Sequence, residues 1–154
     1  MTLALVIAEV GVARVLTFDP PAADTDAATP TSVADLAAGD CFNSDAALDE
    51  VEVRDVAVVP CSEGHTYEVF ALAVHDAGTS AAYPAEDQLA QFAEGECLGA
   101  FEGYVGIEIS ESDFDVHYLY PTPQSWRDGD REVVCVLVDL HDDELDDSAR
   151  DNGR

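Results

Sequence analysis

The chain contains no lysine. Its six basic residues are all arginines, against 33 aspartates and glutamates, so the formal net charge is −27. Nucleic acids and anionic membrane surfaces are bound through basic side chains that contact phosphates. The charge therefore argues against both classes of partner and fits a cationic partner or a saline medium better. The simpler explanation of the acidity is a solvating surface.

The chain also lacks an uninterrupted apolar run. Residues 1–18 are apolar except where Glu9 and Arg14 interrupt them. A membrane helix needs about 20 nearly uninterrupted apolar residues, and a secretory signal needs a basic start and a small-residue cleavage site. Three interpretations stay open: a degenerate or truncated export or anchor segment, a wrongly placed start, or an ordinary element that packs on the domain. We expect contact with a membrane only through this segment, if at all.

Known catalytic signatures are missing as well. The sequence contains no GxSxG motif, no phosphate-binding loop and no HExxH motif. These spacings place a nucleophile, a phosphate cradle or a pair of zinc ligands where the chemistry needs them. We therefore expect a non-enzymatic protein without a cofactor.

Beyond the apolar start, the sequence indicates one domain between a linker and a tail. Residues 19–32 are rich in Pro, Ala, Asp and Thr, which is typical of a linker. Residues 33–140 carry periodic apolar patterns, and a 154-residue chain with 47% hydrophobic residues can form one core. Residues 141–154 are strongly polar, so we predict an acidic disordered tail there.

Apolar periodicity predicts four strands and one main helix. The expected strands cover residues 51–60, 66–75, 114–120 and 131–140. A turn between the first two predicts a hairpin, and the alternation slips at Arg54–Asp55, which indicates a β-bulge. Apolar residues from Leu89 to Tyr104 recur every three or four positions, so they form one stripe of a helix that Gly106 can end. The order ββαββ predicts an α+β fold, an antiparallel sheet with this amphipathic helix on one face.

Four cysteines form an even set without a CxxC pair. Zinc sites usually supply their ligands in pairs two to four residues apart, so disulfides explain the set better. Cys97 lies on the apolar stripe and Cys135 on an apolar strand face, which makes a helix-to-sheet bridge natural and leaves Cys41 to meet Cys61. Sequence alone still allows all three pairings. Two disulfides would place the domain outside the cytosol.

The stretch CSEGHTYEVF brings a thiol, an imidazole and a carboxylate close together, in Cys61, His65 and Glu68. If Cys61 forms a disulfide, its sulfur is neither a ligand nor a nucleophile. His65 and Glu68 are then expected to hydrogen-bond each other or nearby backbone, with a binding role as the alternative. If the strand of His117 pairs with theirs, the two histidines and the glutamate would suffice for catalytic zinc. The spacing does not demand a metal, so none is assigned.

Trp126 and Arg131 form the second conspicuous group. A single helical turn, with Thr122 as its N-cap and Gly129 at its end, presents Trp126. Exposed aromatic and arginine side chains often anchor interfaces, so both residues are candidates for binding. A lone tryptophan in a small domain is more often part of the core. Four tyrosines could also form an aromatic surface for a peptide or glycan: Tyr83, Tyr104, Tyr118 and Tyr120.

Several motifs follow one another through the folded part of the chain. They are AAGDCF, VVPCSEGHTYEVFA, the YP before the helix, the Cys within it, and SWRDGDREVVC. From about residue 35 to about residue 139, this series resembles the septum-formation domain of actinobacterial exported or membrane-anchored proteins. In that family the domain usually follows a hydrophobic anchor or signal and a linker. The resemblance implies a link to cell division and supplies no reaction, substrate or catalytic residue.

The first hypothesis is therefore a non-enzymatic, extracytoplasmic module of the cell envelope, membrane-anchored or secreted, that binds an envelope protein or a wall component during septum formation. The second is a metal-binding protein or metal-dependent hydrolase that uses His65, Glu68 and His117. A third is an acidic secreted inhibitor or chaperone for a basic partner, whose binding would be strongly salt-sensitive.

The charge leads to a prediction about salt. The Debye length falls from about 8 Å at roughly 0.15 M salt to about 3 Å near 1 M, so repulsion among surface carboxylates should ease. The thermal midpoint of the folded chain should therefore rise between low and molar sodium chloride. A midpoint that stays flat or falls over this range would contradict the prediction.

Overall fold

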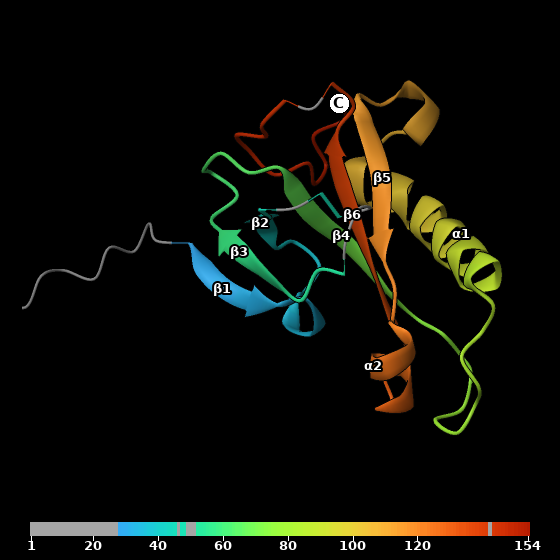
Figure 1. Cartoon of the computed structure of the whole chain (residues 1–154). Coiled ribbons are helices and arrows are strands. Elements are labelled where there is room, and N and C mark those ends of the chain that lie inside the picture. The colour runs from blue at the N-terminus through green and yellow to red at the C-terminus, as the bar shows by residue number, and fades with distance from the viewer. Residues whose placement is uncertain (1–27, 46, 49–51, 142) are drawn as a thin grey trace, which may run out of the picture.

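The computed structural model describes residues 28–154 except 46, 49–51 and 142 (Figure 1). The expected apolar segment 1–18 and most of the expected linker lie outside these residues. The strands in the described part are β1 Thr29–Ser32, β2 Cys41–Asn43, β3 Asp55–Val59, β4 Tyr67–Val74, β5 Phe114–Leu119 and β6 Glu132–Asp139. The helices are α1 Glu86–Val105, α2 Pro123–Arg127 and the two 3-10 turns η1 Val33–Asp35 and η2 Ile109–Glu111.

The strands form one antiparallel sheet in the order β1-β3-β2-β4-β6-β5. β6 lies between β4 and β5, and seven of its eight residues are buried, which explains its nearly continuous apolar sequence. The helix α1 lies along one side of these strands (Figure 1). The predicted α+β fold, an antiparallel sheet with one main helix, is confirmed.

The sheet separates two apolar cores. On one face, α1 packs its apolar stripe against β4, β5 and β6, and the core includes Phe70, Phe101 and Leu137. On the other face, Phe42 and Val136 pack with residues from the β1–β3 end of the sheet. α1 ends at Gly106 in a left-handed conformation with φ of 94°, as predicted. Within the described residues, no helix has both the length and the hydropathy of a membrane span.

β2 separates β3 from β4, so the predicted hairpin between those two strands is wrong. Phe42 of β2 pairs with Val58 of β3 and with Tyr67 of β4. Its fully buried ring stacks on Tyr67 with 5.2 Å between the ring centroids. A strand of three residues is too short to show a period in the sequence, and this is why the pattern missed it.

The predicted bulge and linker also need correction. β3 begins at Asp55, so the slip at Arg54–Asp55 marks the start of a strand. The bulge lies in β4 between Val69 and Ala71. Residues 29–32 of the expected linker form β1, which pairs with β3 at the outer edge of the sheet. Pro30 fits there because an edge strand leaves half of its amides unpaired.

The C-terminal segment, residues 141 and 143–154, packs against the domain, so the prediction of a disordered tail is wrong. Leu145 exchanges two backbone hydrogen bonds with His65, of 3.0 and 2.8 Å. Leu145 and Ala149 are buried in the core on the α1 face. The prediction failed because only a few apolar residues anchor the segment, and its composition is otherwise polar.

Both disulfides occur in the pairing that the residues favoured. Cys97–Cys135 joins α1 to β6 and Cys41–Cys61 joins β2 to the turn after β3, with Cα–Cα distances of 5.4 and 5.2 Å. In the described part of the chain, no cysteine is free.

The two bridges should differ in their contribution to stability. Cys97–Cys135 spans 38 residues and Cys41–Cys61 spans 20, so the chain-entropy model gives about 4 and about 3 kcal/mol. The double variant Cys97→Ala/Cys135→Ala should lower the free energy of unfolding more than Cys41→Ala/Cys61→Ala. Urea unfolding without reductant measures both. Losses below about 1 kcal/mol would contradict the model.

Candidate functional site

Glu68 is the centre of a buried polar cluster between the sheet, α1 and the C-terminal segment. Its side chain has no exposed area. Oε1 accepts hydrogen bonds from the Tyr104 hydroxyl and the Ser148 hydroxyl, both at 2.6 Å. Oε2 accepts one from the Ala149 amide at 2.7 Å. These donors offset much of the cost of burying a carboxylate.

His65 lies beside Glu68 and is also fully buried. Its Nδ1 is 2.7 Å from the Glu63 carbonyl oxygen, so Nδ1 carries the proton and donates it. Its Nε2 is 3.8 Å from Oε2 of Glu68, which is beyond hydrogen-bond length. Among the buried side-chain nitrogens and oxygens of the described residues, Nε2 of His65 has no hydrogen-bond partner. The expected hydrogen bond to Glu68 is thus a longer ion-pair contact, and the expected backbone bond is present.

Burial and neighbouring groups shift the ionisation of both residues. Burial, the strongest influence on His65, lowers its pKa, but Glu68, the Glu63 carbonyl and Asp146 together raise that pKa above 6.5. Burial also acts most strongly on Glu68 and raises its pKa, but contacts with His65 and the three donors together lower that pKa below 4.5. Burial and Glu68 raise the pKa of Tyr104 to about 12. The cluster therefore favours an imidazolium beside a carboxylate.

His117 lies on the other face of the sheet. Glu68 pairs with Leu137, which pairs with Val116, so these three side chains share the α1 face. His117 pairs with Val136 and points to the opposite face. β6 also separates β4 from β5. The structure therefore does not assemble the zinc set of His65, Glu68 and His117, because the strands that carry them do not pair.

Trp126 and Arg131 form a buried cation–π pair. The Cζ atom of Arg131 is 3.7 Å from the centre of the Trp126 ring, and the two residues are 7% and 1% exposed. The guanidinium donates to the backbone carbonyls of Ala77, Gly78, Thr79, Trp126 and Asp130. The indole Nε1 donates to the carbonyl of Ala81 at 2.9 Å. Both side chains hold the loop formed by residues 77–81 against α2. Because they are buried, they offer little surface to a partner.

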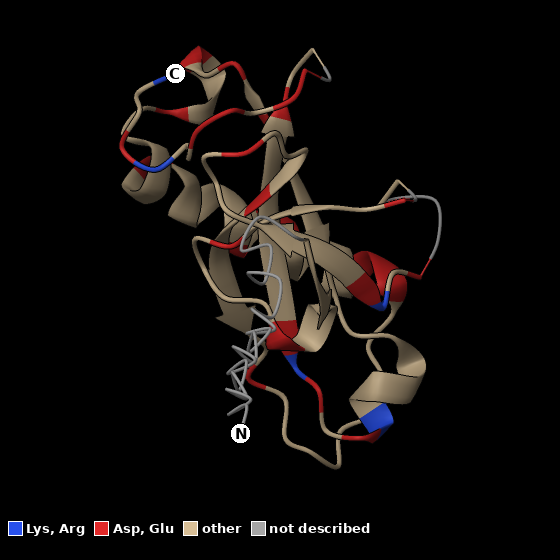
Figure 2. Cartoon of the chain, turned by 90° about the vertical axis from the view of Figure 1, so that its left-hand side faces the viewer, with Lys and Arg blue, Asp and Glu red and all other residues tan. Residues whose placement is uncertain are grey.

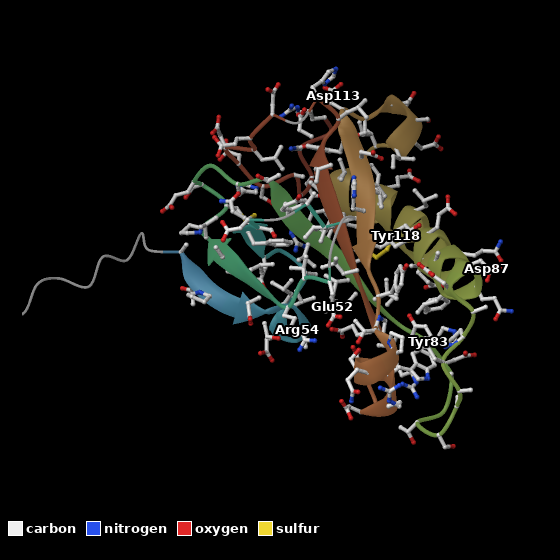
Figure 3. The ribbon with its side chains drawn as sticks, in the orientation of Figure 1. Glu52, Arg54, Tyr83, Asp87, Asp113 and Tyr118 are labelled. Atoms are coloured by element: carbon white, nitrogen blue, oxygen red, sulfur yellow. A yellow bond between two sulfur atoms is a disulfide. The ribbon has the colours of Figure 1, made fainter. Side chains whose placement is uncertain are left out.

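A groove runs along β5, which is the edge strand of the described sheet next to β6. The groove extends to the residues before β3 and to the first residues of α1 and α2. Figure 3 shows Glu52 and Arg54 on one side of the lower part of β5 and β6, and Tyr83 on the other. Tyr83, Tyr118 and Tyr120 line it. Sequence reasoning singled out these tyrosines but could not place the groove, because its walls come from distant segments.

The lining of the groove is strongly acidic. Its carboxylates belong to Glu52, Asp55, Glu86, Asp128, Asp130 and Glu132, against one arginine, Arg54. Burial and, to a smaller extent, the charge of the neighbouring Asp130 raise the pKa of Glu132. Acidic residues also dominate the charged positions across the molecule (Figure 2). A cation bound in the groove would relieve the repulsion among its carboxylates.

The buried pair predicts a pH window. The raised pKa of His65 means that its contribution is complete below pH 6.5 and is lost as the pH rises through the folded pKa. The lowered pKa of Glu68 means that its contribution is present above pH 4.5 and is lost as the pH falls through the folded pKa. The free energy of unfolding of wild type should exceed that of His65→Gln by the largest amount between pH 4.5 and pH 6.5. This difference should shrink as the pH rises above 6.5.

Thermal melts across this pH range measure that difference. His117→Gln, on the opposite face of the sheet, is the matched control and should show no such maximum. A difference for His65→Gln that is independent of pH would contradict the ion pair.

Comparison with known proteins identifies the family. No curated protein matches the chain, and no solved structure matches it. The model of the family described as "Septum formation" matches residues 38–152. The match extends beyond residue 140 into the C-terminal segment, includes all four cysteines, and covers the buried cluster and β5. This chain therefore belongs to the septum-formation family.

Proposed function

We propose that this protein is a non-enzymatic, extracytoplasmic module of the cell envelope that acts in septum formation by binding a cationic segment of an envelope partner. The observation that carries the proposal is the family match over residues 38–152, most of the described chain. Two disulfides support a position outside the cytosol, because reducing compartments keep cysteines as thiols. The proposal assigns attachment to the membrane to the apolar residues 1–18.

The groove along β5 is the proposed binding surface. β5 ends the described sheet. The amides of Phe114 and Val116 already donate to Ser112 Oγ and Asp115 Oδ1, and the remaining outer groups can pair with an extended chain. Tyr118 and Tyr120 would give such a chain apolar contact area at low entropy cost. The surrounding carboxylates favour a partner rich in arginine or lysine and disfavour an acidic wall polymer.

Catalysis is the less favoured function. The hydrolase hypothesis needed His65, Glu68 and His117 around one ion, and the register of β4, β6 and β5 separates them onto two faces. Glu68 and His65 are also covered by the C-terminal segment, so a substrate has no open path to them in this conformation.

Depletion and complementation in the native host test the proposal. Depletion should cause septation defects that wild type restores. Glu86→Gln/Glu132→Gln removes two charges from the groove and should restore septa poorly. Glu94→Gln/Glu96→Gln makes the same chemical change at exposed positions of α1 outside the groove and should restore them fully.

The two parts of the proposal fail separately. Normal septa after depletion would contradict a role in septation. Septation defects that both double variants restore equally would leave that role in place and contradict the groove as the binding surface. Equal amounts of each variant in the cell, measured by immunoblot, make the comparison valid.

A further inference from the structure

The Cys41–Cys61 disulfide lies directly beside the buried pair. Cys41 is the cross-strand partner of Glu68, so the two side chains share the α1 face of the sheet. The possible metal-ligand atoms of Cys41, His65 and Glu68 all lie within 4.8 Å of one another, and all three residues are buried. Cys61 is bonded to Cys41, so its sulfur is one bond away from this group without being one of the three members that lie within that distance. This cluster does not depend on the groove or on the proposed function.

His65 is prepared as a ligand. Its Nδ1 proton is held by the Glu63 carbonyl, so the ring can bind a metal through Nε2 once that atom gives up its own proton. Nε2 has no hydrogen-bond partner despite complete burial, so no hydrogen bond has to break for a metal to take a position beside it. Metal-binding histidines commonly donate their other ring N–H to a carbonyl in this way, which fixes the tautomer.

Glu68 is held in place in the same manner. Tyr104 and Ser148 donate to Oε1, and the Ala149 amide donates to Oε2. A lone pair of Oε2 remains on the side of His65, 3.8 Å from Nε2. Two ligand atoms on one tetrahedral zinc ion lie about 3–4 Å apart, given zinc–nitrogen and zinc–oxygen bonds of about 2 Å. The spacing that is too long for a hydrogen bond therefore suits two ligands of one ion.

We propose that reduction of the Cys41–Cys61 disulfide converts this cluster into a binding site for zinc or a similar divalent transition metal. In the oxidised chain only His65 and Glu68 can donate. A phosphine reductant cleaves the S–S bond: the phosphine and one water yield the phosphine oxide and two thiols. Both thiols, and the His65 ring at Nε2, lose their protons to solvent when they bind the metal. The donors are then two thiolates, one imidazole and one carboxylate, a set of four of the types that zinc uses.

The exchange replaces one cross-link by another. The disulfide ties β2 to the turn after β3, and the metal would tie β2, that turn and β4 together. The reduced chain would thus regain in metal-bound form a connection that reduction removes. Thiol–disulfide exchange with an oxidised small-molecule disulfide would close the Cys41–Cys61 bond again, reduce that disulfide to two thiols and release the metal.

Anaerobic titration of the full chain with cobalt(II) after phosphine reduction tests this proposal. The reduced protein should bind one cobalt ion with thiolate-to-metal charge-transfer absorption and tetrahedral ligand-field bands, and zinc should displace it. The oxidised protein should show neither feature. Cys97→Ser/Cys135→Ser removes the other two thiols and should keep the spectrum. His65→Gln or Glu68→Gln should weaken binding at least tenfold, by analogy with the loss of supporting groups at metal sites, whereas His117→Gln should leave it unchanged.

Folding is followed in parallel by far-ultraviolet circular dichroism. If reduction unfolds the chain, zinc should restore the spectrum of the wild type and of His117→Gln, and not that of His65→Gln. Absence of cobalt binding by the reduced chain would overturn the proposal. So would binding that is equal in His65→Gln, Glu68→Gln and wild type, because this result would assign the ion to the thiols alone.

Discussion

The buried carboxylate of Glu68 is the interaction on which the domain depends. It lies in β4 and receives donors from α1, through Tyr104, and from the C-terminal segment, through Ser148 and Ala149. His65, at the turn before β4, lies beside it and is bonded to Leu145 through the backbone. A buried charge that lost these donors would carry a large desolvation penalty. The sheet, the helix and the last residues of the chain therefore fold as one unit.

The rest of the acidity lies outside this cluster and has a different physical role. The surface carboxylates repel one another and keep the protein surface hydrated. Several of them lie close together because they line the groove along β5. Inside the protein Glu68 ties the sheet to α1 and the C-terminal segment, and the buried Asp139 pairs with Arg154. The many exposed carboxylates define which partner the surface favours. The two disulfides also stabilise the fold. Cys97–Cys135 joins α1 to β6, and Cys41–Cys61 joins β2 to the turn after β3, with Cys41 beside Glu68.

The sequence predicted the features that rest on long periodic patterns. These features are the apolar stripe of α1, the apolar strand β6 and the family. The residues also favoured the pairing of Cys97 with Cys135 without excluding the other two pairings. The sequence missed β2, because three residues carry no period, and so it missed the strand that separates β3 from β4. It also missed the packed C-terminal segment, whose two buried apolar residues, Leu145 and Ala149, are hidden among charged residues.

The candidate site was predicted only in part, for a related reason. His65 and Glu68 lie close in sequence and stay together in the fold. His117 was added to the site on the assumption that its strand, β5, pairs with β4, which carries Glu68. Whether two strands pair depends on the strand order of the sheet, which local sequence patterns do not encode. The donors of Glu68 lie 36 to 81 residues away in the chain, so no local motif could reveal them. Trp126 and Arg131 were grouped from the sequence as candidates for binding; the structure buries both side chains against the loop formed by residues 77–81.

The central claim is that Glu68 fixes the C-terminal segment onto the domain. Hydrogen–deuterium exchange of the intact, oxidised chain tests it most directly, with wild type compared to Glu68→Gln. The account predicts that the amides of Leu145, Ala149 and Asp151 are protected in wild type, because each is hydrogen-bonded. Glu68→Gln should lose this protection while β6 keeps its own. Amides that exchange in wild type as fast as an unfolded peptide, or protection that survives Glu68→Gln unchanged, would contradict the account.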